Sequence, residues 1–114
     1  MELESREIEP GILSIRLSGR MDAAGAGQID VRFTALTATR RSQIMVDLSQ
    51  VTFLASIGVR TLLSNAKAQQ RRGGRMVLFQ PSAAVVEVLK ASGIDAIIPI
   101  AHDMEGARNL LSLS

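Results

Sequence analysis

The chain has 114 residues, of which 46% are hydrophobic and 3% aromatic, with no cysteine and a formal net charge of +2. A chain of this length accommodates one domain with its own hydrophobic core, so we expect a single domain over residues 1–114. The missing cysteines exclude disulfides and thiolate metal sites, and the scarcity of aromatic residues argues against nucleic-acid binding by base stacking.

The first 20 residues predict a β-hairpin. Residues 1–8 are highly charged, which is typical of a strand at a sheet edge, and Pro10 and Gly11 provide a turn. Apolar and polar residues then alternate over positions 13–17, the pattern of a strand with one face in water. We expect Gly19 to close this second strand.

A helix is predicted after Asp22, a residue type that favours the N-cap position. Apolar residues follow at helical spacing at Ile29, Phe33 and Leu36. Gly25 and Gly27 weaken the first turns by about 0.5–1 kcal/mol each relative to alanine, so we expect a loosely wound helix start. Close approach to another element is the alternative reason for these glycines.

The central segment reads as a buried strand at residues 44–46, a short polar turn beginning at Asp47, and a helix that starts at Ser56. Serine is a favoured N-cap, so capping is the structural reading of Ser56. Phe53 and Leu54 are adjacent apolar residues in the connecting segment. Both cannot readily face one core, and we expect one of them to be exposed.

The remaining elements alternate between helix and strand. The pattern predicts that the second helix ends near residues 71–74, followed by a strand at 76–79, a helix from Ser82 to Gly93, a strand at 97–98 and a helix after Asp103. The order β-β-α-β-α-β-α-β-α predicts an α/β fold with a mixed β-sheet and four helices in a single domain.

The sequence lacks the residue patterns that a catalytic site or a metal site requires. A serine nucleophile requires a nearby base, but His102 is the only histidine and no Gly-x-Ser-x-Gly elbow surrounds Ser56. The aspartates are widely spaced, and the glycine-rich segments lack the lysine of a phosphate-binding loop. We therefore expect no catalytic residue, metal or cofactor. A small serine hydrolase or nucleotide-binding enzyme is the weaker reading.

Basic residues and the N-terminus indicate neither nucleic acid nor membrane as a partner. The arginine clusters at residues 40–41 and 71–75 fall at predicted helix ends, where cations complement the helix dipole. Residues 1–4 are acidic, unlike a targeting peptide, and no apolar run approaches the length of a membrane span. We expect a soluble cytoplasmic protein.

Four segments in order, at residues 17–22, 46–58, 72–78 and 88–95, resemble the STAS domain family over nearly the entire chain. The similarity is strongest to the bacterial anti-sigma factor antagonists. This resemblance implies a serine phosphorylated by a GHKL-type serine kinase that is also an anti-sigma factor. The unphosphorylated antagonist binds that kinase, and a PP2C-type phosphatase restores the binding form.

Ser56 occupies the phosphorylated position of the family motif, and Asp22 matches the acidic residue that lies close to it. The resemblance implies a partner-binding surface formed by Asp22, Phe53, Leu54, Ala55, Ser56, Ile57, Gly58 and Arg60. Ala55 replaces the family's usual aspartate and Ile57 its usual serine or threonine. The alternative is a constitutive interaction subunit of a larger signalling or transport assembly, in which Ser56 is not phosphorylated.

Overall fold

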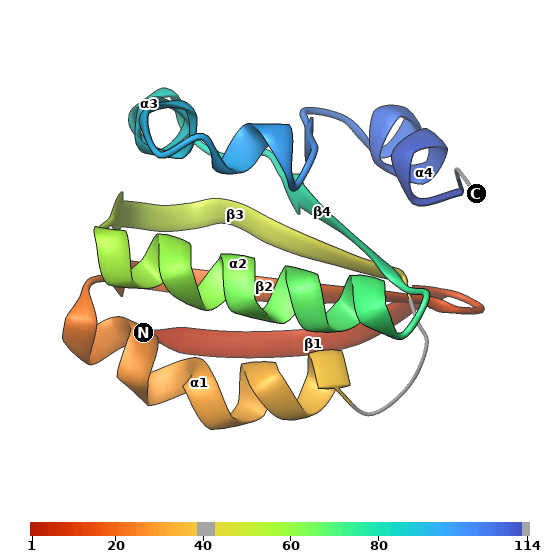
Figure 1. Ribbon diagram of the computed structural model, residues 1–114, viewed down its shortest axis with the longest axis horizontal. Coiled ribbons are helices and arrows are strands. Elements are labelled where there is room, and N and C mark those ends of the chain that lie inside the picture. Colours follow the sequence, from red (N-terminus) through yellow and green to blue (C-terminus); the bar gives the residue numbers. More distant parts are fainter. Residues whose placement is uncertain (39–42, 113–114) are drawn as a thin grey trace.

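A five-stranded mixed sheet lies at the centre of the molecule, with helices packed against it (Figure 1). The computed structural model describes residues 1–38 and 43–112. In chain order the elements are β1 (Glu2–Glu9), β2 (Ile12–Met21), α1 (Ala23–Ala38), β3 (Gln43–Leu54), α2 (Ser56–Arg71), β4 (Arg75–Phe79), α3 (Ala83–Ala91), the 3₁₀ turn η1 (Ile94–Ala96), β5 (Ile100–Ala101) and α4 (Met104–Ser112).

The strands lie side by side in chain order, from β1 at one edge to β5 at the other. The β1–β2 pair is antiparallel, and the β2–β3, β3–β4 and β4–β5 pairs are parallel. The predicted α/β class, opening hairpin and element order are confirmed. The predicted helix end at Arg40 and Arg41 lies outside the described residues.

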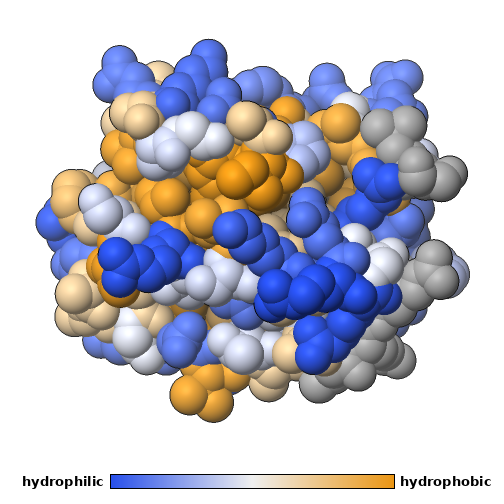
Figure 2. Space-filling view, viewed as in Figure 1, coloured by the Kyte–Doolittle hydropathy of each residue, from blue (hydrophilic) through white to orange (hydrophobic). Residues whose placement is uncertain are grey.

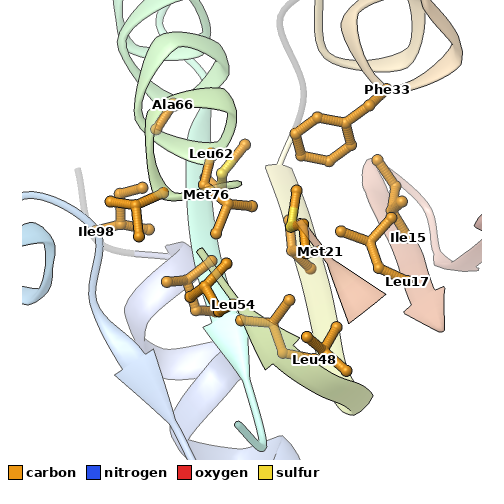
Figure 3. Close-up of a cluster of buried hydrophobic side chains, with 14 of the residues drawn as sticks. Ile15, Leu17, Met21, Phe33, Leu48, Leu54, Leu62, Ala66, Met76 and Ile98 are labelled. Atoms are coloured by element: carbon orange, nitrogen blue, oxygen red, sulfur yellow. The ribbon is translucent and has the colours of Figure 1, made fainter. Parts of the chain in front are cut away.

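Hydrophobic side chains cover both faces of the sheet, because successive residues of a strand point to opposite sides. Val46 belongs to the larger core cluster, which α1, α2 and α3 share, whereas its neighbour Met45 belongs to a smaller cluster with α4. In the larger cluster, Phe33 of α1 lies over Ile15 and Leu17 of β2 (Figure 3). Full burial of each such side chain contributes about 1.5–3 kcal/mol.

The polar turn predicted from Asp47 onward is wrong, since β3 continues unbroken to Leu54. Its register against β2 shifts twice, and each shift places one extra residue in β3. These bulges change the spacing of inward-facing residues from two to three, so that Leu48, Val51 and Leu54 all enter the core. A search for strict alternation therefore misses this half of the strand.

Two other strand boundaries also differ from the prediction. Gly19 does not close β2, which accommodates its positive φ of 108° and continues to Met21. The last strand lies at Ile100–Ala101 instead of residues 97–98. The N–H groups of Ile97 and Ile98 both bond to the Ile94 carbonyl, and this turn geometry keeps them out of the sheet.

The surface between α2 and the α3–η1 segment is apolar (Figure 2). Ile98 is buried there within the core, whereas Ile97, which follows η1, leaves 40% of its surface exposed. Across residues 1–38 and 43–112, no helix combines the length and apolar character needed to cross a membrane.

Candidate functional site

The first turns of α1 and α2 lie at the same end of the sheet (Figure 1). α1 follows β2 directly and α2 follows β3, and these two strands are parallel neighbours. At the C-terminal ends of β2 and β3, the Ala55 N–H donates a hydrogen bond of 3.0 Å to the Met21 carbonyl. This bond places Ser56 and Asp22, which are 34 positions apart, at adjacent helix starts.

The start of α2 packs closely against the end of β2 because residue 58 is glycine. A Cβ atom at Gly58 would lie 2.9 Å from the Met21 carbonyl oxygen and 2.7 Å from a methyl group of Leu54. These distances are too short for any side chain. Gly58 therefore belongs to the packing of the site, and its buried position offers no side chain to a partner.

The start of α1 has the same requirement at Gly25. A Cβ atom there would lie 1.9 Å from the Arg20 carbonyl oxygen, whereas one at Gly27 would meet nothing within 4 Å. The expectation of a loosely wound helix start is therefore wrong for Gly25, which permits close approach. Gly27 has no comparable structural requirement.

Ser56 is the first residue of α2, and Ala55 is its N-cap. The capping role predicted for Ser56 is wrong, because β3 continues to Leu54 and leaves Ala55 in the extended conformation of a cap. Ala55 has no side chain that could accept a hydrogen bond, and the first helical bond runs from the Val59 N–H to its carbonyl. The backbone N–H groups of residues 56–58 thus have no acceptor within the helix.

The Ser56 side chain is exposed, and no hydrogen bond to it occurs among the described residues. No acidic residue lies in the first turn of α2 or of α1. A negative group on this hydroxyl would therefore meet free N–H groups and the positive end of the helix dipole, without a carboxylate in its own helical turn.

Asp22 caps α1 as predicted, accepting a 2.8 Å hydrogen bond at Oδ1 from the Gly25 N–H. This bond, together with the nearby Arg20 guanidinium, holds the pKa of the Asp22 carboxyl below its ordinary value of 3.8. Arg20 Nε lies 3.6 Å from Asp22 Oδ2. Asp22 is therefore anionic at neutral pH and already engaged by its own helix and by Arg20.

Arg20 also lies over the ring of Phe53, with its guanidinium carbon 4.3 Å from the ring centroid. The two residues are partners in the β2–β3 register, so Arg20 links Asp22 to the end of β3. The sequence analysis missed Arg20, because the pairing depends on a bulged register. Its position immediately before Met21 and Asp22 is the one feature of the sequence that points to Arg20.

An exposed apolar surface flanks Ser56. Phe53 and Ile57 leave 40% and 37% of their surfaces exposed. The expectation that one of Phe53 and Leu54 is exposed is confirmed, since Leu54 is only 3% exposed and packs in the core (Figure 3). The Leu54 side chain must therefore be removed from the expected partner-binding surface.

The other candidate chemistry does not gather at Ser56. His102 is exposed after β5, and no hydrogen bond joins it to Ser56 within the described residues. In the same part of the chain, no three histidine or acidic side chains are grouped to hold a metal ion. Asp47, predicted as a turn former, accepts from the Ser49 N–H and pairs with Arg16 within the sheet.

Comparison with known proteins adds a family match. The family model described as the STAS domain matches residues 5–107. BtrV of Bordetella bronchiseptica, named as an anti-sigma factor antagonist, is 30% identical over 107 residues, which cover 94% of this chain and 91% of that protein.

Solved structures show the same fold. The match to an anti-sigma factor antagonist from Thermotoga maritima has a TM-score of 0.85 at 18% identity, covering 97% of this chain and 95% of the other. The match to unphosphorylated SpoIIAA, an anti-sigma factor antagonist, has a TM-score of 0.78 at 21% identity and covers 99% of both chains. Phosphorylated SpoIIAA from Bacillus matches at 0.70 and 21% identity, covering 95% of this chain and 98% of the other.

Proposed function

The chain belongs to the STAS domain family, and from that premise we propose that it is an anti-sigma factor antagonist controlled by phosphorylation of Ser56. The observation that carries the proposal is the setting of Ser56. Its hydroxyl is exposed at the first position of a helix whose cap residue has no capping side chain. A phosphate adds about −1.5 to −2 charges there, which suits a switch.

The proposed partner is an anti-sigma factor that is also a GHKL-type serine kinase. In the transfer step, the Ser56 oxygen forms a bond to the γ-phosphorus of ATP as the bond from that phosphorus to the ADP oxygen breaks. The serine proton passes to a base on the kinase. A PP2C-type phosphatase would restore the hydroxyl by hydrolysis.

The contact surface in this proposal is centred on Ser56. Phe53 and Ile57 supply exposed apolar area, Asp22 and Arg60 supply charge at its border, and Ala55 leaves the helix start open. In the complex, a phosphate at the centre of such a surface would have to lose its hydration without a matched partner on the anti-sigma factor, and this can cost several kcal/mol. The unmodified chain binds its anti-sigma factor, and the modified chain is released.

The two residues beside Ser56, Ala55 and Ile57, affect how phosphorylation of Ser56 would act. An alanine before the serine removes a carboxylate that would repel the phosphate, so the modified state is easier to hold. Ile57 leaves Ser56 as the one hydroxyl at the start of the helix. If a kinase requires the missing carboxylate, the chain is instead a constitutive interaction subunit of a signalling or transport assembly.

The test combines phosphorylation with binding. The purified chain is incubated with ATP and a purified GHKL-type serine kinase from the same organism, and the modified peptide is identified by mass spectrometry. We expect phosphate on Ser56 alone. In titrations, Ser56→Ala should bind the kinase within about threefold of the wild type, and Ser56→Asp about 100-fold more weakly, which corresponds to about 2.7 kcal/mol.

Ser64→Asp is the matched control, because Ser64 is also exposed on α2 and lies two turns further along the helix. It should leave binding unchanged. An unmodified Ser56 together with equal affinities for Ser56→Asp and Ser56→Ala would refute the phosphorylation switch and support the constitutive interaction subunit.

A further inference from the structure

We propose that Arg60 binds the phosphate of phosphorylated Ser56 and holds it against the surface of α2. The inference rests on the proposed function, because it concerns the modified form of Ser56. It goes further by assigning the phosphate a partner within the chain, one helical turn away from the modified oxygen.

The helix places the two side chains on the same side. Ser56 and Arg60 are both exposed residues of α2, four positions apart. Residues with this separation are neighbours on a helix surface, with Cβ atoms about 5–6 Å apart. The anion stands toward the N-terminus and the cation toward the C-terminus, which is the favourable order for such a pair.

Arg60 is available for this role. Among the described residues, no carboxylate oxygen lies within 4 Å of its guanidinium, whereas Arg16, Arg20 and Arg108 each have an acidic partner. Arg60 lines a shallow hollow between α1 and α2, together with Thr61 and Asp30. Asp30 lies beyond ion-pair distance and on the α1 side, so a phosphate on α2 would not displace an existing contact of Arg60.

The chemistry favours arginine as the phosphate partner. Its planar guanidinium presents parallel N–H donors that match two phosphate oxygens. The N–H groups at the start of α2, which have no acceptor within the helix, are further donors close to residue 56. The dianion gains more from these donors than the monoanion does, so Arg60 should lower the pH at which the second ionisation of the phosphate occurs. Asp22 and Arg20 at the adjacent start of α1 also act on the phosphate, but they are the same in each variant compared.

The test uses the full chain with phosphoserine incorporated at position 56 during translation, so that no kinase is involved. A ³¹P NMR titration then reports the second pKa of the phosphate, ordinarily about 6. We expect Arg60→Gln to raise this pKa by about 0.2–0.4 unit relative to the phosphorylated chain with Arg60. Arg60→Lys should preserve part of the difference, since lysine retains the charge but loses the two parallel donors.

Arg71→Gln provides the matched control, because it removes the same charge from an exposed residue at the far end of α2. It should change the pKa by less than about 0.1 unit, since the roughly 20 Å between the sites exceeds the screening length in physiological salt. An equal pKa in the Arg60→Gln and Arg60 chains would overturn the proposal, as would equal shifts for Arg60→Gln and Arg71→Gln. Either result leaves kinase recognition of Ser56 untouched, and a failure of the kinase to modify Ser56 leaves this titration valid.

Discussion

The start of α2 differs from the starts of the other three α-helices in the described part of the chain. α1, α3 and α4 each begin with a side chain that accepts a backbone N–H, from Asp22 at 2.8 Å, Ser82 at 3.3 Å and Asp103 at 2.7 Å. α2 begins with Ala55, which makes no such bond. The helix that carries Ser56 is thus the one that leaves its first N–H groups open.

This difference has an energetic meaning. A capping side chain contributes about 1 kcal/mol to a helix, and α2 lacks this contribution. Packing compensates for the loss, because Val59, Leu62 and Ala66 of α2 lie in the larger core cluster. The fold therefore holds α2 in place without a cap and keeps its N-terminus open to a negative group.

The largest expected effect concerns the packing that both helix starts share against β2. Gly25→Ala should lower the free energy of unfolding by about 3 kcal/mol, because the new methyl group would overlap the Arg20 carbonyl. Gly27→Ala, two residues away in open space, should instead raise it by about 0.5–1 kcal/mol. Urea unfolding measures both, and equal changes in the two variants would contradict the close approach.

An intermediate effect is expected when the capping difference is removed. Ala55→Ser supplies α2 with an acceptor for its free N–H groups and should raise the free energy of unfolding by about 1 kcal/mol. Ser82→Ala removes the cap of α3 and should lower it by a similar amount, about 1 kcal/mol. If Ala55→Ser leaves the unfolding midpoint in urea unchanged, α2 does not gain from a capping side chain.

The smallest effect is the pH dependence of the α1 cap. The Gly25 N–H holds the pKa of Asp22 below its unfolded value, so the carboxylate stabilises the fold above that unfolded value and loses this contribution as the pH falls through the folded pKa. Asp22→Asn keeps a capping oxygen but does not titrate. The melting temperature of the wild type relative to Asp22→Asn should therefore be higher at about pH 6 than at about pH 2.

Thermal unfolding at several pH values measures this difference. Glu87→Gln, on the exposed surface of α3, is a suitable control, since Glu87 makes no ion pair among the described residues. A constant melting-temperature difference between the wild type and Asp22→Asn would contradict the lowered pKa of Asp22.

Local patterns predicted most of the elements correctly. Asp22, Ser82 and Asp103 cap their helices as expected, since capping depends on residues three positions apart in the chain. The stop of α2 near Gly73 and Gly74 is confirmed by hydrogen bonds of their N–H groups to Gln70 and Gln69. Such features need no knowledge of the rest of the fold.

The candidate site was predicted less completely. The sequence located Ser56 at a helix start, but placed it one position too early in the helix and left out Arg20. Both errors have one origin in β3, whose bulges extend the strand to Leu54 and set Phe53 beside Arg20. A bulge depends on the neighbouring strand, so the residues of β3 by themselves do not reveal it.

The amino-acid order alone determined the alternation of strands and helices, three of the four caps and the segment that contains Ser56, because each depends on contacts between residues close in the chain. Tertiary structure decided the rest. The parallel pairing of β2 with β3, and the close packing that Gly25 and Gly58 allow, bring two distant helix starts together. That pairing also leaves Ala55 as the cap and Ser56 exposed, since register is a property of two strands and not of one.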